Sequence, residues 1–338
     1  MNTLIISRIL AFVIILAMMP TVPLAATPAE LEQSCQDKIA TFSIVARDSA
    51  TGELGIAVAS RFFAVGAVVP WAKAGIGAVA TQSYANTTFG WRGLELLEQG
   101  LTPAEAINVL TRNDDNPEQR QVGIVAADGN SATYTGAKCL AWAGGRQGRD
   151  YAIQGNILAG EAVVTAMEKT FLETKGTLAD RLYAALLAGE ANGGDSRGKQ
   201  SAAMLVVRAG AGYGGYTDRA IDIRVDDSPE PFEELGRLLT MAQMNYAWND
   251  AWTLFTQKKY AEALAPMERA AGLAPDYGEV HYDLACIRLA AGDKPGALEA
   301  IKKALKLNPK LANQASKDDD LAGLRGDKEF EKIVGGGK

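Results

Sequence analysis

The stretch Thr41-Phe-Ser-Ile-Val-Ala-Arg-Asp48, followed by Ser-Ala-Thr-Gly52 and then by Leu54-Gly-Ile-Ala-Val-Ala59, decides how the chain begins to fold. Apolar and β-branched residues dominate the two outer segments, whereas the link between them is rich in turn-forming residues. This pattern predicts a β-hairpin with strands over 41–46 and 54–59. Because side chains alternate along a strand with period two, Thr41 and Ser43 share one face of the first strand.

Strands and helices on the C-terminal side of this hairpin occur in groups. Short apolar runs predict further strands, in chain order over 62–69, 74–81, 122–127, 132–135 and 201–208. Amphipathic patterns predict helices over 91–98, 102–111, 161–174 and 177–191. Thr102 as N-cap, with Pro103 next and Glu105 at the third helical position, gives the second helix a clear start. The grouping favours an α+β fold over a doubly wound α/β sheet.

From Ser228 onward the pattern becomes almost entirely helical, and Pro229 and Pro231 mark the change. A self-similarity with a period of 34 residues follows. Five pairs of positions carry it: Ala251 and Ala285, Ala263 and Ala297, Met267 and Ile301, Ala270 and Ala304, and Pro275 and Pro309. This period, with small residues at the close-packing positions, resembles the tetratricopeptide repeat. We therefore expect an all-α repeat domain over 229–338, in which 318–334 forms a partial third unit or a cap.

The first 26 residues have the features of an export signal. Arg8 precedes the apolar run Ile9–Met19, which is too short to span a bilayer comfortably, and Ala25 and Ala26 offer a cleavage site. An uncleaved anchor is the alternative. We expect an exported protein, periplasmic or secreted, without membrane contact after cleavage. Residues 27–40 would then be a linker or a propeptide ahead of a first domain over 41–228.

Composition narrows the chemistry that this protein can perform. The chain of 338 residues is 48% hydrophobic and carries a net charge of −6 without basic clusters, so it has material for a core but not the charge pattern of a nucleic-acid binder. Its single histidine, His281, lies in the predicted repeats, which excludes Ser-His-Asp and Cys-His catalysis and a histidine-rich metal site in the first domain. We expect neither a cofactor nor a metal. Cys35 and Cys139 can pair in an oxidising compartment or remain free thiols.

One type of nucleophile needs no imidazole. An N-terminal Thr or Ser uses its own α-amino group, with a pKa near 8, as the general base. Thr41 meets the positional requirement, because the small residue Ala40 precedes it and a β-strand follows. The peptide bond between Ala40 and Thr41 must be cut to release the amine. Ser43 is the weaker candidate on the same strand face.

A family resemblance runs through the first domain. Its segments are Ala40–Asp48, Gly55–Gly66, Gly77–Asn86, Gly93–Leu97, Arg120–Gly123, Gln154–Gly160, Gly193–Ser201 and Arg224–Asp227. Over about 40–228 the chain resembles the DUF1028 family, which is grouped with the N-terminal nucleophile hydrolases. The resemblance implies a four-layer αββα sandwich with Thr41 as the nucleophile. Relatives often carry His after the Trp142-Ala-Gly stretch and after Val225-Asp-Asp, where this chain has Gly145 and Ser228, so any role of those histidines is unfilled here.

Polar residues near predicted strand ends complete the candidate site. Ser60 and Arg61 can hydrogen-bond the nucleophile or hold a substrate carboxylate, or they simply finish a strand. The amides of Gln82, Asn86, Gln154 and Asn156 can stabilise an oxyanion or orient a substrate, or they form turns. Asp195, next to Arg197, can bind a substrate amine or its own backbone. We assign Thr41, Ser60, Arg61 and Asn156 to catalysis and the remaining five residues to substrate binding.

Two functions fit this sequence. The first is an exported amidohydrolase that acts on an amide bond of a small peptide or amino-acid derivative, with repeats that recruit a protein partner. The second is a non-catalytic module that binds a peptide or protein through its cleft and its repeats. The enzyme requires a mature chain that begins at Thr41, whereas the binding module accepts any start from Ala26 onward. Association into a homo-oligomer is compatible with both functions.

Overall fold

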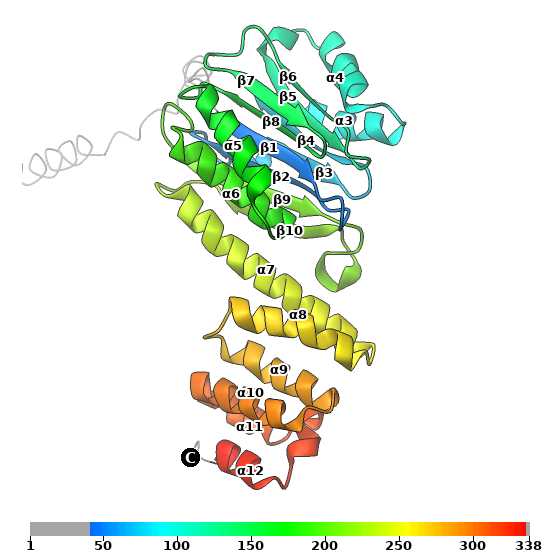
Figure 1. Ribbon diagram of the computed structural model, residues 1–338, viewed down its shortest axis with the longest axis vertical. Helices are drawn as coiled ribbons and strands as arrows, with labels where there is room; N and C mark the ends of the chain where they lie inside the picture. The colour runs from blue at the N-terminus through cyan, green and yellow to red at the C-terminus, as the bar shows by residue number, and fades with distance from the viewer. Residues whose placement is uncertain (1–40, 336–338) are drawn as a thin grey trace, which may run out of the picture. The chain divides into compact units, whose positions relative to one another are not determined.

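The structure, a computed structural model, describes residues 41–335. The predicted export signal, the segment 27–40 and Cys35 lie outside these residues. Within them, the chain forms two antiparallel sheets with flanking helices, followed by a run of helices (Figure 1). The predicted α+β class of the first part and the helical character of the second are confirmed. In the described part of the chain, no helix is long and apolar enough to cross a membrane.

The first sheet has six strands, and the predicted hairpin lies at its centre. In spatial order the strands are β10 (Arg219–Val225), β9 (Ser201–Val207), β2 (Leu54–Ser60), β1 (Thr41–Arg47), β8 (Tyr151–Asn156) and β7 (Gly144–Gly148). Every neighbouring pair is antiparallel. β1 is therefore hydrogen-bonded on both edges, with Thr41 opposite the last residues of β2 and β8.

The second sheet has four antiparallel strands, in the order β3 (Pro70–Lys73), β4 (Gly77–Ser83), β5 (Arg120–Ala126) and β6 (Ser131–Thr135). It packs face to face with the first sheet through small and β-branched side chains. Val45 and Val58 belong to the same buried cluster as Ala78, Ala80 and Val125. Thr41 and Ser43 lie on the Val45 side of β1 and so face the second sheet.

Helices cover the outer face of each sheet. Phe42 and Ile44, on the other side of β1, pack with residues of α5 (Glu161–Glu173) and α6 (Leu178–Ala191). On the second sheet, Val79 and Ile124 pack under α3 (Thr88–Glu98) and α4 (Pro103–Arg112). The predicted capping box at the start of α4 is present, with Thr102 and Glu105 capping each other's backbone N–H.

One predicted strand is absent, and several observed strands were not predicted. Residues 62–69 do not form a strand; they contain a 3-10 turn over Val65–Ala67, entered by Ala64 at a left-handed φ of 54°. Val65 and Val69 still lie in the core between the sheets, which explains the apolar pattern. No bounds were predicted for β3, β7, β8 or β10: β3 and β7 are short, β7 is glycine-rich and β10 is charged on one face. Gln154 and Asn156 were expected near a strand end, and they do lie in the last half of β8. Such strands are held by their neighbours rather than by propensity.

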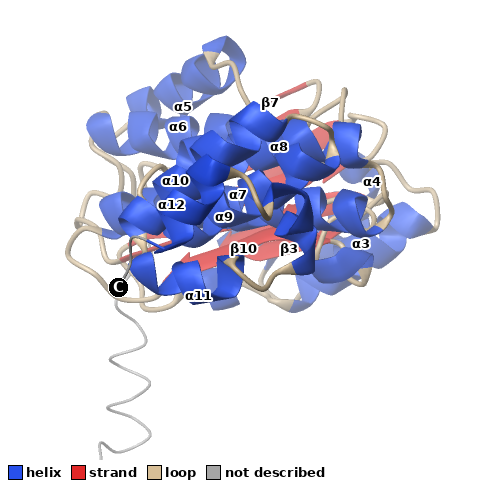
Figure 2. Cartoon of the chain, turned by 90° about the horizontal axis from the view of Figure 1, so that it is seen from below, coloured by secondary structure: helices blue, strands red, loops and turns tan. Residues whose placement is uncertain are grey.

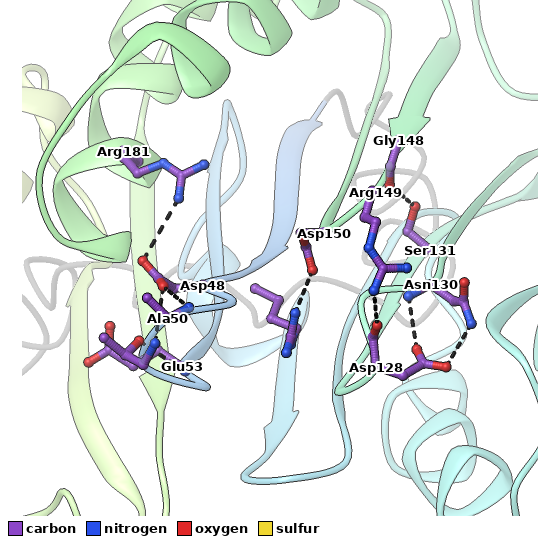
Figure 3. Close-up of polar contacts among 12 residues, drawn as sticks. Asp48, Ala50, Glu53, Asp128, Asn130, Ser131, Gly148, Arg149, Asp150 and Arg181 are labelled. Carbon is purple, nitrogen blue, oxygen red and sulfur yellow. Dashed lines mark hydrogen bonds and ion pairs between the residues drawn. The ribbon is translucent and has the colours of Figure 1, made fainter.

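The turn end of the central hairpin, opposite Thr41, is held by ionic and turn contacts (Figure 3). The Asp48 carboxylate accepts hydrogen bonds from the backbone N–H groups of Ala50 at 2.8 Å and Thr51 at 3.2 Å. Arg181 on α6 lies 3.9 Å from the same carboxylate. Arg47 donates to Asp150 at 2.8 Å across to the β7–β8 turn. These contacts fix the register of β1, and with it the position of Thr41 at the other end.

The helical part begins with α7 (Pro231–Thr256) and continues with α8 (Tyr260–Leu273), α9 (Gly278–Ala290) and α10 (Lys294–Leu307). The short helices α11 (Ala312–Ala315) and α12 (Lys328–Gly335) follow, and Figure 2 shows α7–α12 in helix colour. Eight of the residues that defined the 34-residue period have fully buried side chains: Ala251, Ala263, Met267, Ala270, Ala285, Ala297, Ile301 and Ala304. The repeat pattern therefore marks the packing core of this part.

Helix α7 belongs to both hydrophobic cores. Phe232, Leu235 and Leu239 in its first half pack with the first-sheet cluster, where the Phe232 ring stacks on Phe42 with centroids 6.3 Å apart. Ala247 and Ala251 in its second half belong to the repeat core. The composition change at Ser228 therefore marks the start of the helical part, but α7 still packs against the first sheet.

Candidate functional site

A row of polar side chains crosses the first sheet at the start of β1. The strand register places Ser201 of β9 opposite Ser60 of β2, Ser60 opposite Thr41, and Thr41 opposite Asn156 of β8. Directly opposed residues in an antiparallel sheet point to the same face, so all four side chains lie on the side that meets the second sheet. All four are buried. We call these residues the polar row.

The row brings Thr41 into contact with a second hydroxyl group. Thr41 Oγ1 lies 3.1 Å from Ser60 Oγ, and either oxygen can be the donor. Ser201 at the end of the row accepts from the backbone N–H of Val65 at 3.2 Å and donates to the carbonyl of Phe62 at 2.5 Å. Ser201 therefore fixes the chain that leaves β2, and with it the position of Ser60.

Beneath the polar row, buried glutamines connect the two sheets. Ser43 Oγ donates to Gln82 Oε1 on β4 and accepts from Gln154 Nε2 on β8, both at 2.6 Å. Gln82 Nε2 donates to the carbonyl of Thr41 at 3.2 Å and to Gln121 Oε1 on β5 at 2.9 Å. The Ser43 hydroxyl is thus engaged as donor and as acceptor, which makes it a structural group rather than a free nucleophile.

Gln121 is the centre of this network. Its Nε2 donates to the carbonyl of Gly155 at 2.7 Å and to Thr135 Oγ1 at 2.9 Å, and its Oε1 accepts from Asn156 Nδ2 at 2.9 Å. Asn156 Oδ1, by contrast, is buried and has no hydrogen-bond partner among the described residues. A buried acceptor left unpaired costs about 1–3 kcal/mol of stability.

A tight turn closes the end of the sheet above Thr41. Asp195 forms an isolated β-bridge with Leu158, just past Asn156, and its Oδ2 accepts from the backbone N–H of Arg61, just past Ser60, at 2.8 Å. Because β1 lies between β2 and β8, this turn spans the end of the strand that begins with Thr41. The Asp195 carboxylate also accepts from the backbone N–H and the guanidinium of Arg197. These contacts support the interpretation of Asp195 as a turn residue that binds backbone.

Two arginines border the same turn. Arg61 donates from its guanidinium to the carbonyl of Arg197 at 2.9 Å, and Arg197 donates to the carbonyl of Arg61 at 3.0 Å. Arg61 is solvent-exposed, whereas Arg197 is half-buried. This reciprocal pairing places two positive charges at the edge of the site, and guanidinium groups are suited to binding carboxylates.

Asn86 lies in a separate cluster. Its Oδ1 accepts from the backbone N–H and hydroxyl of Thr88 at the start of α3, and its Nδ2 donates to Asp114 at 2.7 Å. Burial works to raise the pKa of Asp114, but hydrogen bonds from Arg120 and Asn86 outweigh it and lower that pKa. Asn86 therefore binds the first residue of α3 and supports an ion pair, and these contacts do not join it to the polar row.

Of the predicted residues, the structure brings together Thr41, Ser60 and Asn156, with Gln82 and Gln154 beneath them and with Arg61, Asp195 and Arg197 at the closing turn. Gln121 and Ser201 belong to the same assembly but were not predicted. A signal existed for both: each is a polar residue next to an apolar run, and buried polar residues require partners. Which partners they find depends on strand pairing.

The histidine of the repeats has a structural environment. His281 Nε2 lies 2.9 Å from the carbonyl of Pro275, and burial lowers its pKa. Within residues 41–335, no group of three or more His, Cys, Asp or Glu side chains is arranged to hold a metal ion. The site at Thr41 consists of hydroxyl and amide groups, with two guanidinium groups and the Asp195 carboxylate at the closing turn.

The fold and site together define an α+β protein with a buried polar row, extended by helical repeats. The sequence profile of DUF1028, described as a family of unknown function, matches residues 41–235. The chain belongs to this family. A tetratricopeptide-repeat profile matches residues 254–317. The resemblances to DUF1028 and to tetratricopeptide repeats are thus confirmed.

A solved structure agrees with this assignment. The chain is similar to the crystal structure of protein SPO2555 from Silicibacter pomeroyi, also of the DUF1028 family, with 32% sequence identity and a TM-score of 0.56. The similarity covers 60% of this chain and 86% of that chain. A search of curated proteins found no match.

Proposed function

We propose that this protein is an exported N-terminal nucleophile amidohydrolase that cuts an amide bond in a small peptide or amino-acid derivative. Thr41, at the first position of a central strand and facing the layer between two sheets, is the observation that carries the proposal. Helices outside two face-to-face sheets are the layering expected of the αββα sandwich of N-terminal nucleophile hydrolases. The segment 27–40 would be the propeptide removed at the Ala40–Thr41 bond.

In the proposed reaction, Thr41 Oγ1 adds to the substrate carbonyl while the freed α-amino group of Thr41 takes the hydroxyl proton. The amine returns this proton to the leaving nitrogen as the amide bond breaks, which leaves an ester on Thr41. Water then hydrolyses the ester, with the same amine as general base. Ser60, in contact with Thr41 Oγ1, orients the hydroxyl, and backbone N–H groups with a polar side chain stabilise the oxyanion.

The closing turn suggests what the substrate carries. Arg61 and Arg197 lie at the edge of the site, and guanidinium groups bind carboxylates with two parallel hydrogen bonds. An amino-acid derivative or peptide with a free carboxylate near the scissile amide would match these charges. Gln82 and Gln154, which are held in the network beneath the row, act by fixing the position of β1 rather than by touching substrate.

A binding function is the second candidate, and the tetratricopeptide repeats favour it. Repeats of this kind present surfaces that hold extended segments of a protein partner. Such a protein would keep the polar row as structure and would bind through α7–α10. In the enzyme, the same repeats would recruit a partner to the hydrolase.

The mature N-terminus decides between the two functions. We expect N-terminal sequencing and intact mass of the protein from its exported compartment to give a chain that begins at Thr41. Thr41→Ala should keep the preceding residues and lower amide hydrolysis by about 10³-fold or more, whereas Thr41→Ser retains both reactions. A mature wild-type chain that begins between 26 and 40 would reject the hydrolase and favour the binding module.

A further inference from the structure

Asn156 Oδ1 is an acceptor without a donor at the centre of the candidate site. Together with Arg208 Nε, it is one of the buried side-chain polar atoms that have no hydrogen-bond partner within residues 41–335. Asn156 is fully buried and lies directly opposite Thr41 in the strand register. The contacts of the described residues therefore leave this acceptor without a donor.

The surrounding carbonyl groups fix which way the Asn156 amide points. Gln121 Nε2 faces the carbonyls of Gly155 at 2.7 Å and Gly144 at 3.3 Å, and a carbonyl can only accept. The nitrogen of Gln121 must therefore lie at that end, which puts its oxygen beside Asn156. That oxygen requires a donor, so Asn156 presents Nδ2 to Gln121 and turns Oδ1 away from it.

A second, independent set of carbonyls supports this orientation. Gln82 Nε2 lies 3.2 Å from the carbonyl of Thr41 and 3.3 Å from that of Gln154, and it also donates to Gln121 Oε1. Gln121 Oε1 therefore accepts from two amides whose orientations agree. If the oxygen and nitrogen of Gln121 were exchanged, its nitrogen would face the amide nitrogens of Gln82 and Asn156. Its oxygen would then face the carbonyl oxygens of Gly144 and Gly155.

This orientation changes the role of Asn156. An oxyanion needs donors, but the atom that Asn156 leaves unpaired is an acceptor. The side chains of Asn156 and Thr41 lie on the same face, with Cβ atoms about 5 Å apart for directly opposed residues. An amide oxygen beyond the Cβ of Asn156 can therefore reach the backbone nitrogen or the hydroxyl of Thr41.

We propose that Asn156 Oδ1 accepts a hydrogen bond from the α-amino group that Thr41 gains when the Ala40–Thr41 bond is cut, and that Gln121 is the positioning residue that sets this orientation. The inference rests on the proposed function. Cutting the bond converts a peptide nitrogen with one hydrogen into an amine with two or an ammonium with three. The site then contains a donor for the unpaired oxygen, and the hydrogen bond holds the amine beside Thr41 Oγ1.

The pKa of this amine tests the inference without a known substrate. The protein is prepared from a fusion whose partner is removed directly before Thr41, so that every variant begins with a free amine. The pKa follows from the pH dependence of trace acetylation by acetic anhydride, read at the N-terminal peptide by mass spectrometry. Periodate oxidation, which cleaves an N-terminal Thr, confirms the free end.

Asn156→Ala should lower the amine pKa by about 0.5–1 unit relative to the wild type, because the acceptor that stabilises the ammonium form is lost. Asn156→Asp should raise it by about 1 unit or more, because a carboxylate then faces the ammonium. Gln121→Leu should shift it in the direction of Asn156→Ala, since the amide loses its fixed orientation. Asn313→Asp, on the exposed surface of α11, makes the same change of charge far from the row and should leave the pKa unchanged.

Equal pKa values in the wild type and in folded Asn156→Ala and Asn156→Asp would overturn the inference. Circular dichroism and thermal melting of each variant establish that it is folded, and either folded Asn156 variant suffices for the comparison. The result is separate from the fate of the proposed function. If the exported protein does not begin at Thr41, the hydrolase fails, whereas the fusion-derived protein still shows whether Asn156 binds the amine.

Discussion

Gly123 on β5 shows how single residues determine the distance between the two sheets. A Cβ atom at this position would lie 1.9 Å from Gln154 Oε1 and 2.5 Å from its Cδ. Gln154 cannot retreat easily, because its Nε2 is hydrogen-bonded to Ser43. Glycine is therefore required here for close packing and not for an unusual backbone angle.

We expect Gly123→Ala to lower the free energy of unfolding by about 1–3 kcal/mol, the usual cost of overpacking a core. Chemical denaturation, followed by circular dichroism, measures the change. Gly272→Ala is the matched control: a Cβ there, inside α8, meets no atom within 4 Å, and alanine should stabilise the helix by about 0.5–1 kcal/mol. Equal stabilities of the wild type and Gly123→Ala would show that the glutamine network has room to move.

Among the elements, α7 unites the two halves of the chain. Leu235 on α7 is fully buried against the first-sheet core, whereas Met241, less than two turns further on, is 45% exposed. The Tyr183 hydroxyl donates to the carbonyl of Phe232 at 3.0 Å, and Gln243 donates to Asp180 at 2.8 Å, so α6 holds the helix at two points. A boundary drawn at Ser228 by composition therefore separates α7 from the sheet that it covers.

Leu235→Ala should destabilise the protein by about 2–5 kcal/mol, because it leaves a cavity under α7. Met241→Ala, on the same helix, should change the stability by less than about 0.5 kcal/mol. Thermal and denaturant unfolding of the two variants provide the comparison. Similar losses in both would show that burial against the sheet does not set the contribution of Leu235.

Most helices and the central hairpin were predictable, and several strands were not. α4, α5 and α6 follow amphipathic periods, α4 and α6 with capping boxes, and each is observed within one or two residues of its predicted bounds. β8 carries Gln154 and Asn156, which were expected near a strand end, but its sequence, Tyr-Ala-Ile-Gln-Gly-Asn, does not define the bounds of a strand. Its strand conformation comes from pairing with β1 and β7, which is a tertiary effect.

At the scale of the whole molecule, two cores share α7, and the repeat core holds a half-buried carboxylate. In the repeat core, burial raises the pKa of Asp283 from 3.8 to about 6, although Trp248 Nε1 donates to its carboxylate at 2.7 Å. An acid whose pKa is raised on folding stabilises the folded state fully below pH 4. This contribution is lost as the pH rises through about 6.

We expect Asp283→Asn to gain stability relative to the wild type as the pH rises from 4 to 7, by up to about 3 kcal/mol for a pKa shift of about two units. The asparagine oxygen can still accept from Trp248, so the packing is kept. Urea unfolding at several pH values, followed by tryptophan fluorescence, gives the difference between the two proteins. A difference that stays constant over this range would show that Asp283 titrates normally.

The sequence by itself determined the hairpin, the α+β character of the first part, the 34-residue helical repeat and the position of Thr41 at the start of a strand. These features depend on residues close together in the sequence, because hydrophobic periodicity and turn-forming residues are local patterns. The tertiary structure alone decided that Thr41 meets Ser60 and Asn156, and that Gln121 turns the Asn156 oxygen away from itself. Strand register joins Thr41 to Asn156, 115 positions away, and sheet packing joins Asn156 to Gln121 on the other sheet. No local pattern encodes such pairings.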